Sequence, residues 1–333
     1  KNYIIFLDNT PFCKDLKLMF KSKINIVLGT KLNTIVKKFL NKNKKYSFDI
    51  GLGHFLNVPE EKIKGFGNGM RDWKSGFQRT IDYWDLRNKD PNFFSFKDID
   101  VSYDYKCDFF NKLEIKKDEK IALIHIKNQK ANACAKPTDP ETYHSTIEFL
   151  LSNNYKIILN GREEMPDSFK NYPIFNYAEC NEATWLNDVI LCDRSDLNIC
   201  FGSGIIGLSC VLNKPSLYIG FWHLFQPSPN KKGLFIPTLL KNKNTGKYLS
   251  FKEQIDYCLD SKKQVFNSEK FDAVNPSNQD ILNGTKELIE IINGKLKISK
   301  DQINFNLKYG NIPLAKCQSH ISENFLKKYN HLI

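Results

Sequence analysis

The sequence predicts an α/β protein whose domains are built on doubly wound parallel sheets. Apolar runs of strand length alternate with segments of helical periodicity through most of the 333 residues. The runs are continuously apolar, as in strands that are buried on both faces of a sheet. The stretch Leu191–Trp222 shows the pattern most clearly, with two such runs flanking a glycine-serine turn and an apolar helix.

This stretch is the first candidate for a ligand site. The strand Leu197–Phe201 breaks into a turn made by three small residues, Gly202, Ser203 and Gly204. Ser203 is a favourable N-cap for a helix at Ile205–Leu212, whose free backbone N–H groups and positive dipole end favour an anion. The alternative is a structural strand-helix-strand unit without a ligand, because a single Gly-Ser-Gly is a weak signal.

The second block of the chain, from residue 116 to residue 300, contains five predicted parallel strands separated by helices. The strands are expected at Ile121–Ile126, Tyr155–Leu159, Ile174–Tyr177, Leu197–Phe201 and Ser216–Phe221. The helices are expected at Glu141–Asn153, Thr184–Cys192, Ile205–Leu212, Phe251–Leu259 and Asn278–Ile292. Lys231–Lys247, rich in lysine and asparagine, is expected to be a loop interrupted by Leu234–Leu240.

The first block, residues 1–115, shows a similar alternation and is predicted to be a domain of its own. Its strands are expected at Tyr3–Leu7, Ile24–Leu28 and Phe48–Leu52. Gly65–Ser95 is aromatic and irregular, which indicates a connecting segment or helix pair. The remaining residues, 301–333, are predicted to be a helical segment, with a helix at Ile321–Tyr329, that packs back toward the first domain.

Composition narrows the choice of partner and compartment. Lys and Arg number 49 against 37 Asp and Glu, so the net charge is +12, which favours an anionic partner. Nine cysteines without a Cys-x-x-Cys pair indicate reduced thiols and a cytoplasmic protein. No apolar run reaches the length of a spanning helix, so the expected membrane contact is peripheral, with an anionic surface.

In an open parallel sheet, the ligand lies beyond the carboxyl ends of the strands. His125 and Lys127 leave one predicted strand, and Gly161 and Arg162 leave the next. Together with the Ser203 turn, they predict a site for a phosphate, with Arg162 as its clamp. No acidic metal-binding pair is evident nearby, so a metal-independent nucleotide transferase without a cofactor is predicted.

Each of these residues also has a structural interpretation. His125 is equally consistent with a packed core histidine, and Arg162 with a surface partner of Glu163 or Glu164. Trp222 is either the wall of a base pocket or only the end of a strand.

The candidates for a general base are two side chains of the first block that follow predicted strands. Asp8 and His54 are both expected to face an interdomain cleft, and either can take a proton from an acceptor hydroxyl.

Five pieces of the chain, in order, resemble a family of bacterial glycosyltransferases found with surface-polysaccharide genes. They are ALIHIKN, DPETYHSTIEFLLSNNYKIILNGREE, WLNDVILCDRSDLNICFGSGIIGL, LFIPTLLKNKNTGKYLSFKEQI and HISENFLKKY. The resemblance implies a GT-B fold, in which two Rossmann-like domains face a cleft. The nucleotide-sugar would bind the second domain, and a glycan or lipid-linked glycan acceptor would enter the cleft.

The resemblance also assigns residues to the donor site. The family's strand-end histidine matches His125, its following basic residue matches Lys127, and its glycine matches Gly161. Its Ser-Gly pair matches Ser203-Gly204. The family usually has arginine where Lys127 stands, and lysine offers a point charge in place of a planar fork.

We therefore predict a metal-independent glycosyltransferase of surface-glycan synthesis at the cytoplasmic side of a bacterial envelope. Two alternatives remain at this level. A nucleotide-sugar epimerase of GT-B fold would share the donor site and need no acceptor. A non-catalytic module that binds a glycan or another polyanion would use the +12 charge, and nucleic acid is ranked last among its partners.

Overall fold

The computed structural model of the chain describes residues 4–7, 25–28, 101–127, 137–161, 163–202, 205–222, 232–260, 266–309 and 319–333. In the first block, β1 (Ile4–Leu7) pairs in parallel with β2 (Asn25–Leu28), which confirms two predicted strands. The predicted strand Phe48–Leu52 and the aromatic segment Gly65–Ser95 lie outside the described residues.

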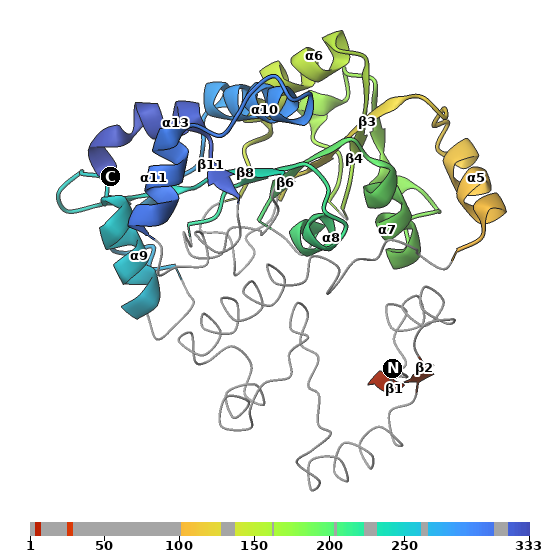
Figure 1. Cartoon of the computed structure of the whole chain (residues 1–333), viewed down its shortest axis with the longest axis horizontal. Helices are drawn as coiled ribbons and strands as arrows, with labels where there is room; N and C mark the ends of the chain where they lie inside the picture. The colour runs from red at the N-terminus through yellow and green to blue at the C-terminus, as the bar shows by residue number, and fades with distance from the viewer. Residues whose placement is uncertain are drawn as a thin grey trace, which may run out of the picture.

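The second block forms a seven-stranded sheet in which every pair of neighbours is parallel. The strand order is β11-β8-β7-β6-β3-β4-β5, which confirms the doubly wound α/β fold (Figure 1). The strands are β3 (Lys120–His125), β4 (Tyr155–Leu159), β5 (Ile174–Asn176), β6 (Leu197–Phe201), β7 (Ser216–Ile219), β8 (Gly233–Ile236) and β11 (His320–Ile321).

Helices cover both faces of this sheet, as its continuously apolar strands require. Ala122 and Ile124 of β3 belong to the core beneath α6 (His144–Ser152) and α10 (Asn278–Ile292). Ile121 and Leu123 belong to the opposite core, with α5 and α7. Figure 1 shows α6 and α10 on one side of the sheet and α7 and α8 on the other. The remaining helices here are α5 (Tyr103–Lys112), α7 (Trp185–Arg194), α8 (Ile205–Val211) and α9 (Phe251–Asp260).

Local sequence signals define several helix ends. Asp139 accepts a hydrogen bond from the backbone N–H of Glu141 at 3.1 Å, and Pro140 occupies the first turn, as predicted. The first turn is a 3-10 helix, η1 (Pro140–Tyr143), which continues into α6. α10 begins with a capping box between Ser277 and Asp280 and has the predicted bounds.

The interruption expected at Leu234–Leu240 within the Lys231–Lys247 loop forms two strands. Residues 233–236 form β8, a fully buried strand inside the sheet, and β9 (Leu239–Asn242) pairs antiparallel with β10 (Phe271–Val274). The lysines and asparagines that suggested a loop flank two short apolar runs. Gly284 of α10 lets the helix lie against β8, since a Cβ there would be 2.7 Å from Cδ1 of Ile236.

The C-terminal segment completes one edge of the sheet. Its elements are α11 (Lys300–Lys308), β11 and α13 (Glu323–Lys328). The buried Glu287 carboxylate of α10 accepts hydrogen bonds from Gln302, Ser322 and the backbone of Glu323. These contacts hold the segment on the second block, and any packing against residues 1–100 lies outside the described residues.

The helix α5 was not predicted. It begins after Ser102, whose hydroxyl accepts from the backbone N–H of Tyr105 at 3.2 Å. Its Phe109, and Leu113 just after it, are buried in the same core as β3. The packing of α5 on the second block is observed, whereas the domain boundary near residue 115 stays a prediction.

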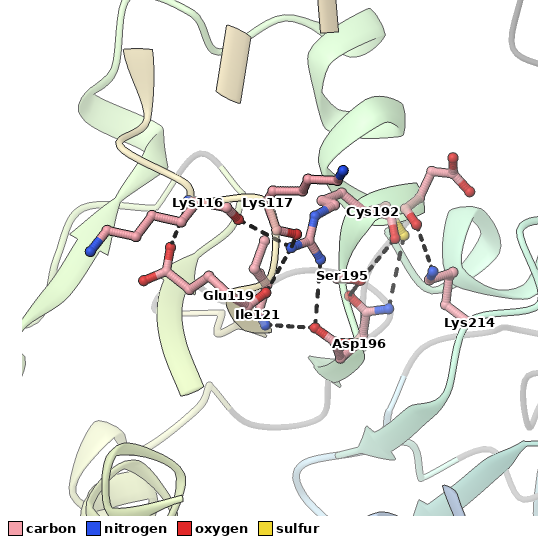
Figure 2. Close-up of polar contacts among 11 residues, drawn as sticks. Lys116, Lys117, Glu119, Ile121, Cys192, Ser195, Asp196 and Lys214 are labelled. Atoms are coloured by element: carbon pink, nitrogen blue, oxygen red, sulfur yellow. Dashed lines mark hydrogen bonds and ion pairs between the residues drawn. The ribbon is translucent and has the colours of Figure 1, made fainter. Parts of the chain in front are cut away.

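All strands of the parallel sheet start on the same side, which we call the amino edge. A network of hydrogen bonds holds the chain there (Figure 2). The guanidinium of Arg194 donates to the carbonyls of Lys116, Lys117 and Glu119 at 3.3, 2.8 and 2.7 Å. The Asp196 carboxylate accepts from the backbone N–H of Ile121 at 2.7 Å. These contacts fix the start of β3 against the turn between α7 and β6.

Candidate functional site

The order of the strands reverses between β3 and β6. From β3 the chain moves outward through β4 to β5, then returns to β6 on the other side of β3 and continues through β7 to β8. In open parallel sheets, ligands bind outside the carboxyl ends of the strands at such a reversal. The residues that follow β3, β4 and β6 therefore form the candidate site.

His125 ends β3 and is 6% exposed. Burial and, to a smaller extent, the positive charge of Lys127 lower the pKa of His125 to about 4. The charge of Glu163 and a backbone hydrogen bond with Phe201 oppose this shift in pKa. The imidazole is therefore neutral at physiological pH, with one nitrogen that donates and one that accepts a hydrogen bond.

Gly161 makes room for this imidazole. Its φ of +130° is a backbone conformation that L side chains rarely adopt. A Cβ at this position would lie 2.9 Å from Cδ2 and 3.1 Å from Nε2 of His125. The ring thus packs directly on the backbone after β4, which brings together two of the predicted site residues.

Lys127 and Glu163 form an ion pair across the ends of β3 and β4. The Lys127 Nζ lies 3.1 Å from Oε1 of Glu163, and their side chains are 27% and 13% exposed. The charges of both residues act on His125. Sequence reasoning considered Glu163 only as a surface partner of Arg162, because strand order alone does not show which side chains meet.

The backbone at Lys127 is pinned as well. Its N–H donates to the hydroxyl of Thr138 at 2.9 Å, and its carbonyl accepts from the N–H of Thr138 at 2.8 Å. Pro137 accepts from Asn275 at 2.9 Å, and Asn275 in turn accepts from Thr238 at 2.8 Å. These bonds join the segment after β3 to the segments after β8 and β10.

Asn160 follows β4 and is 3% exposed. Its backbone N–H donates to the carbonyl of Ile124 at 2.8 Å, which extends the ladder between β3 and β4. Within the part of the chain that the structure describes, neither Oδ1 nor Nδ2 of Asn160 has a hydrogen-bond partner. A buried amide without partners is unfavourable, so this side chain is a candidate contact for a polar ligand.

Gly202 follows β6, and its N–H donates to the carbonyl of Ile219 at 3.1 Å. The helix that follows, α8, starts at Ile205 as predicted. Five other predicted site residues lie outside the described residues, and their roles stay predictions: Asp8, His54, Arg162, Ser203 and Gly204.

Trp222 belongs to the core and is not a pocket wall. Its side chain is completely buried, with ring centroids 5.9 Å from those of Tyr257 and Phe266. Gln254 donates to the Trp222 carbonyl at 2.8 Å. Trp222, three residues after the end of β7 at Ile219, thus packs as a core residue.

Neither a cluster of metal ligands nor a membrane-spanning helix occurs among the described residues. These residues include no group of three or more His, Cys, Asp or Glu side chains that could hold a metal ion. Their helices are also too short or too polar to cross a bilayer. Metal independence remains a prediction from the sequence.

No family profile matches the chain, and no curated protein matches it. Three solved structures that match are all of low similarity. ADP-heptose LPS heptosyltransferase II of E. coli is 15% identical over 47% of this chain and 48% of its own, with a TM-score of 0.33. The family 9 glycosyl transferase of Veillonella parvula is 12% identical over 87% and 97%, with a TM-score of 0.44.

The third match is the S. aureus MnaA–UDP co-structure, which is 10% identical over 89% of this chain and 98% of its own. Its TM-score is 0.36. The chain spans about half the length of the heptosyltransferase. With TM-scores below 0.5, these likenesses do not carry an argument on activity, and the proposals below rest on the chain's own residues.

Proposed function

We propose that the protein is a glycosyltransferase that moves a sugar from a nucleotide-sugar to an acceptor hydroxyl in bacterial surface-glycan synthesis. The observation that carries the proposal is the convergence of His125, Lys127, Asn160 and Gly161 where the strand order reverses. This set offers a positive charge, a neutral imidazole and an amide along adjoining strand ends. Such groups suit the phosphates and polar edges of a nucleotide.

In the proposed reaction, the acceptor oxygen forms a bond to the anomeric carbon while the bond from that carbon to the phosphate oxygen breaks. The acceptor proton passes to a base, for which Asp8 and His54 are the candidates. Negative charge develops on the leaving phosphate, to which Lys127 would donate a hydrogen bond. The neutral His125, whose ring is hydrogen-bonded to the backbone of Phe201, would pack behind this group without the cost of burying a charge.

The sequence resemblance supports the same assignment. It implies a GT-B arrangement with an acceptor domain at residues 1–115, a donor domain at residues 116–300 and a final segment at residues 301–333. Under this proposal, the acceptor is a glycan or a lipid-linked glycan, and the enzyme works at the inner face of the cytoplasmic membrane. An epimerase would share the donor site and convert the donor with no acceptor present.

A panel of nucleotide-sugars tests the proposal by thermal shift on the full chain. A ligand at about 100 times its dissociation constant adds about 2.7 kcal/mol to the free energy of unfolding. We expect one class of nucleotide-sugar to raise the melting temperature clearly. If none does, the donor site is wrong; if one binds and is epimerised without an acceptor, the epimerase replaces the transferase.

The substitution Lys127→Met tests the position of the site. We expect the affinity for the stabilising nucleotide-sugar to fall about tenfold, since the phosphate loses its positive partner and faces Glu163 alone. Isothermal titration calorimetry measures the change. Lys112→Met is the matched control, because Lys112 also pairs with a glutamate, Glu182 at 2.8 Å, but lies on α5. Equal losses in both variants would remove Lys127 from the site.

A further inference from the structure

An acidic side chain stands inside a site that is proposed to bind phosphate. Glu163 follows β4, its side chain is 13% exposed, and its Oε1 lies 3.1 Å from the Lys127 Nζ. The neighbouring Glu164 is exposed, so only the first of these two adjacent glutamates lies against Lys127. An ion pair with this much burial is partly shielded from salt and keeps its electrostatic effect.

The Lys127–Glu163 ion pair weakens the electrostatic attraction of a phosphate to this position. Lys127 alone would attract each negative charge of a phosphate, and Glu163, whose Oε1 lies 3.1 Å from the Lys127 Nζ, would repel the same charges. At the carboxyl ends of β3 and β4, the two charges therefore largely cancel. His125 adds no charge, because burial keeps it neutral above its pKa of about 4. A site built only for strong phosphate binding would omit Glu163.

The proposed reaction changes the charge of the nucleotide. In a nucleotide diphosphate-sugar, the terminal phosphate is esterified and carries one charge. When the bond to the anomeric carbon breaks, the leaving oxygen stays on that phosphate, which then has a second ionisable group with a pKa of about 6. Above that pH, the product carries one more negative charge than the donor. An uncompensated lysine would hold the product more tightly than the donor.

We propose that Glu163 is a specificity-determining residue that cancels the charge of Lys127, so that the site does not favour the nucleoside diphosphate product over the nucleotide-sugar donor. This inference rests on the proposed function. It assigns to Glu163 a role in product release, which in many enzymes limits the turnover rate.

The substitution Glu163→Gln tests the inference through a ratio of affinities. The probes are matched pairs, UDP with UDP-glucose, GDP with GDP-mannose and ADP with ADP-glucose, and the pair that binds the wild type is carried forward. At pH 8, we expect the variant to bind the diphosphate about tenfold more tightly, relative to the sugar nucleotide, than the wild type does. Glu164→Gln is the matched control and should leave the ratio unchanged.

The pH dependence separates this role from a structural one. Among the described residues, the charged or titratable groups that face one another here are His125, Lys127 and Glu163, and His125, with its pKa of about 4, does not account for a change near pH 6. In Glu163→Gln, the preference for the diphosphate should appear as the pH rises through about 6, where its terminal phosphate gains charge. In the wild type, the ratio should stay nearly constant between pH 5.5 and 8.

A double variant distinguishes the effect of the lost charge from an effect of misfolding. In the double variant Lys127→Met/Glu163→Gln, both charges are absent, so the ratio should return to the wild-type value. Weaker binding of both probes by Glu163→Gln would overturn the inference, since Glu163 would then contact a hydroxyl that donor and product share. An unchanged ratio would overturn it too. If neither probe of any pair binds the wild type, the proposed function falls as well.

Discussion

In the seven-stranded sheet, the side where the strands start (the amino edge) and the side where they end (the carboxyl edge) differ in how their polar groups are satisfied. At the amino edge, Arg194 and Asp196 bind backbone groups of Lys116, Lys117, Glu119 and Ile121, in contacts that are exposed or partly buried. At the carboxyl edge, Asn160 has an amide that meets no described partner, and Gly161 and Gly220 have positive φ. The amino edge is thus held by satisfied polar groups, whereas the carboxyl edge has an amide without a described partner and glycines with positive φ, as expected where the donor site is proposed.

The largest expected effect comes from Gly220, which follows β7 at the carboxyl edge. Its φ is +82°, and a Cβ would lie 2.1 Å from Cε2 of the buried Phe201. We expect Gly220→Ala to lower the free energy of unfolding by about 3–5 kcal/mol, from backbone strain plus displacement of the ring. Urea denaturation measures the loss.

Gly246→Ala is the control for this substitution. Gly246 also has positive φ, +66°, but no atom lies within 4 Å of the Cβ position. It should lose only about 1 kcal/mol. Equal losses at the two glycines would show that the carboxyl edge is not tightly packed around Phe201.

The next largest effect is the pH dependence of the free energy of unfolding that results from the buried His125. Burial lowers the pKa of His125 to about 4, whereas an unfolded histidine has a pKa near 6.5. Between these values the unfolded chain binds a proton that the folded chain does not. Stability is therefore unaffected above about pH 6.5 and is lost as the pH falls toward 4, by about 3 kcal/mol in total.

Comparison of the wild type with His125→Asn isolates this dependence. Denaturation at pH 7 and at pH 4.5 should show a smaller acid loss in the variant. His320, whose pKa burial also lowers, is present in both proteins and cancels in the difference. An identical acid loss in both would mean that the His125 imidazole is already protonated, or accessible to water, in the folded protein.

The amino edge is tested by Arg194→Met. Three carbonyls lose a charged donor, so we expect a loss of about 2 kcal/mol in the free energy of unfolding. Nucleotide affinity should not change, because the substitution lies at the edge opposite the proposed site. Lys170→Met is the control: its ion pair with Asp167 is exposed on both sides and should contribute nothing measurable. A loss of nucleotide affinity in Arg194→Met would break the division between the edges.

The smallest effect on stability is expected for Asn160→Leu. Because its amide meets no described partner, an apolar side chain of similar volume should leave stability unchanged or raise it by up to about 1 kcal/mol. The affinity for the stabilising nucleotide-sugar should fall at the same time, in a calorimetric titration. A clear loss of stability would instead show that Asn160 supports the fold.

Most of the fold of the second block could be predicted from the sequence. The strands Tyr155–Leu159 and Leu197–Phe201 and the helix Asn278–Ile292 have the predicted bounds, because their apolar periods and caps are local signals. The strands β8 and β11 could not be predicted in this way. The lysine- and asparagine-rich sequence around β8 favours a loop, and a strand of two residues such as β11 forms only through its partner, which lies far along the chain.

The site was predictable in outline, since strand ends converge in any parallel sheet. His125, Lys127 and Gly161 could be named because each follows a clear apolar run. The role of Glu163 could not be, because its contact with Lys127 depends on rotamers at the ends of two different strands. The need for glycine at residue 161 likewise depends on the ring of His125, which no local pattern shows.

The pairing of β11 with β8 has a consequence for synthesis on the ribosome. His320 lies opposite Leu234, so β8 has an open edge until the C-terminal segment has been made. At about 5–20 residues per second, the intervening chain takes about 4–17 seconds to translate. During that interval the nascent sheet exposes an apolar strand edge, which makes this edge a candidate binding site for a chaperone.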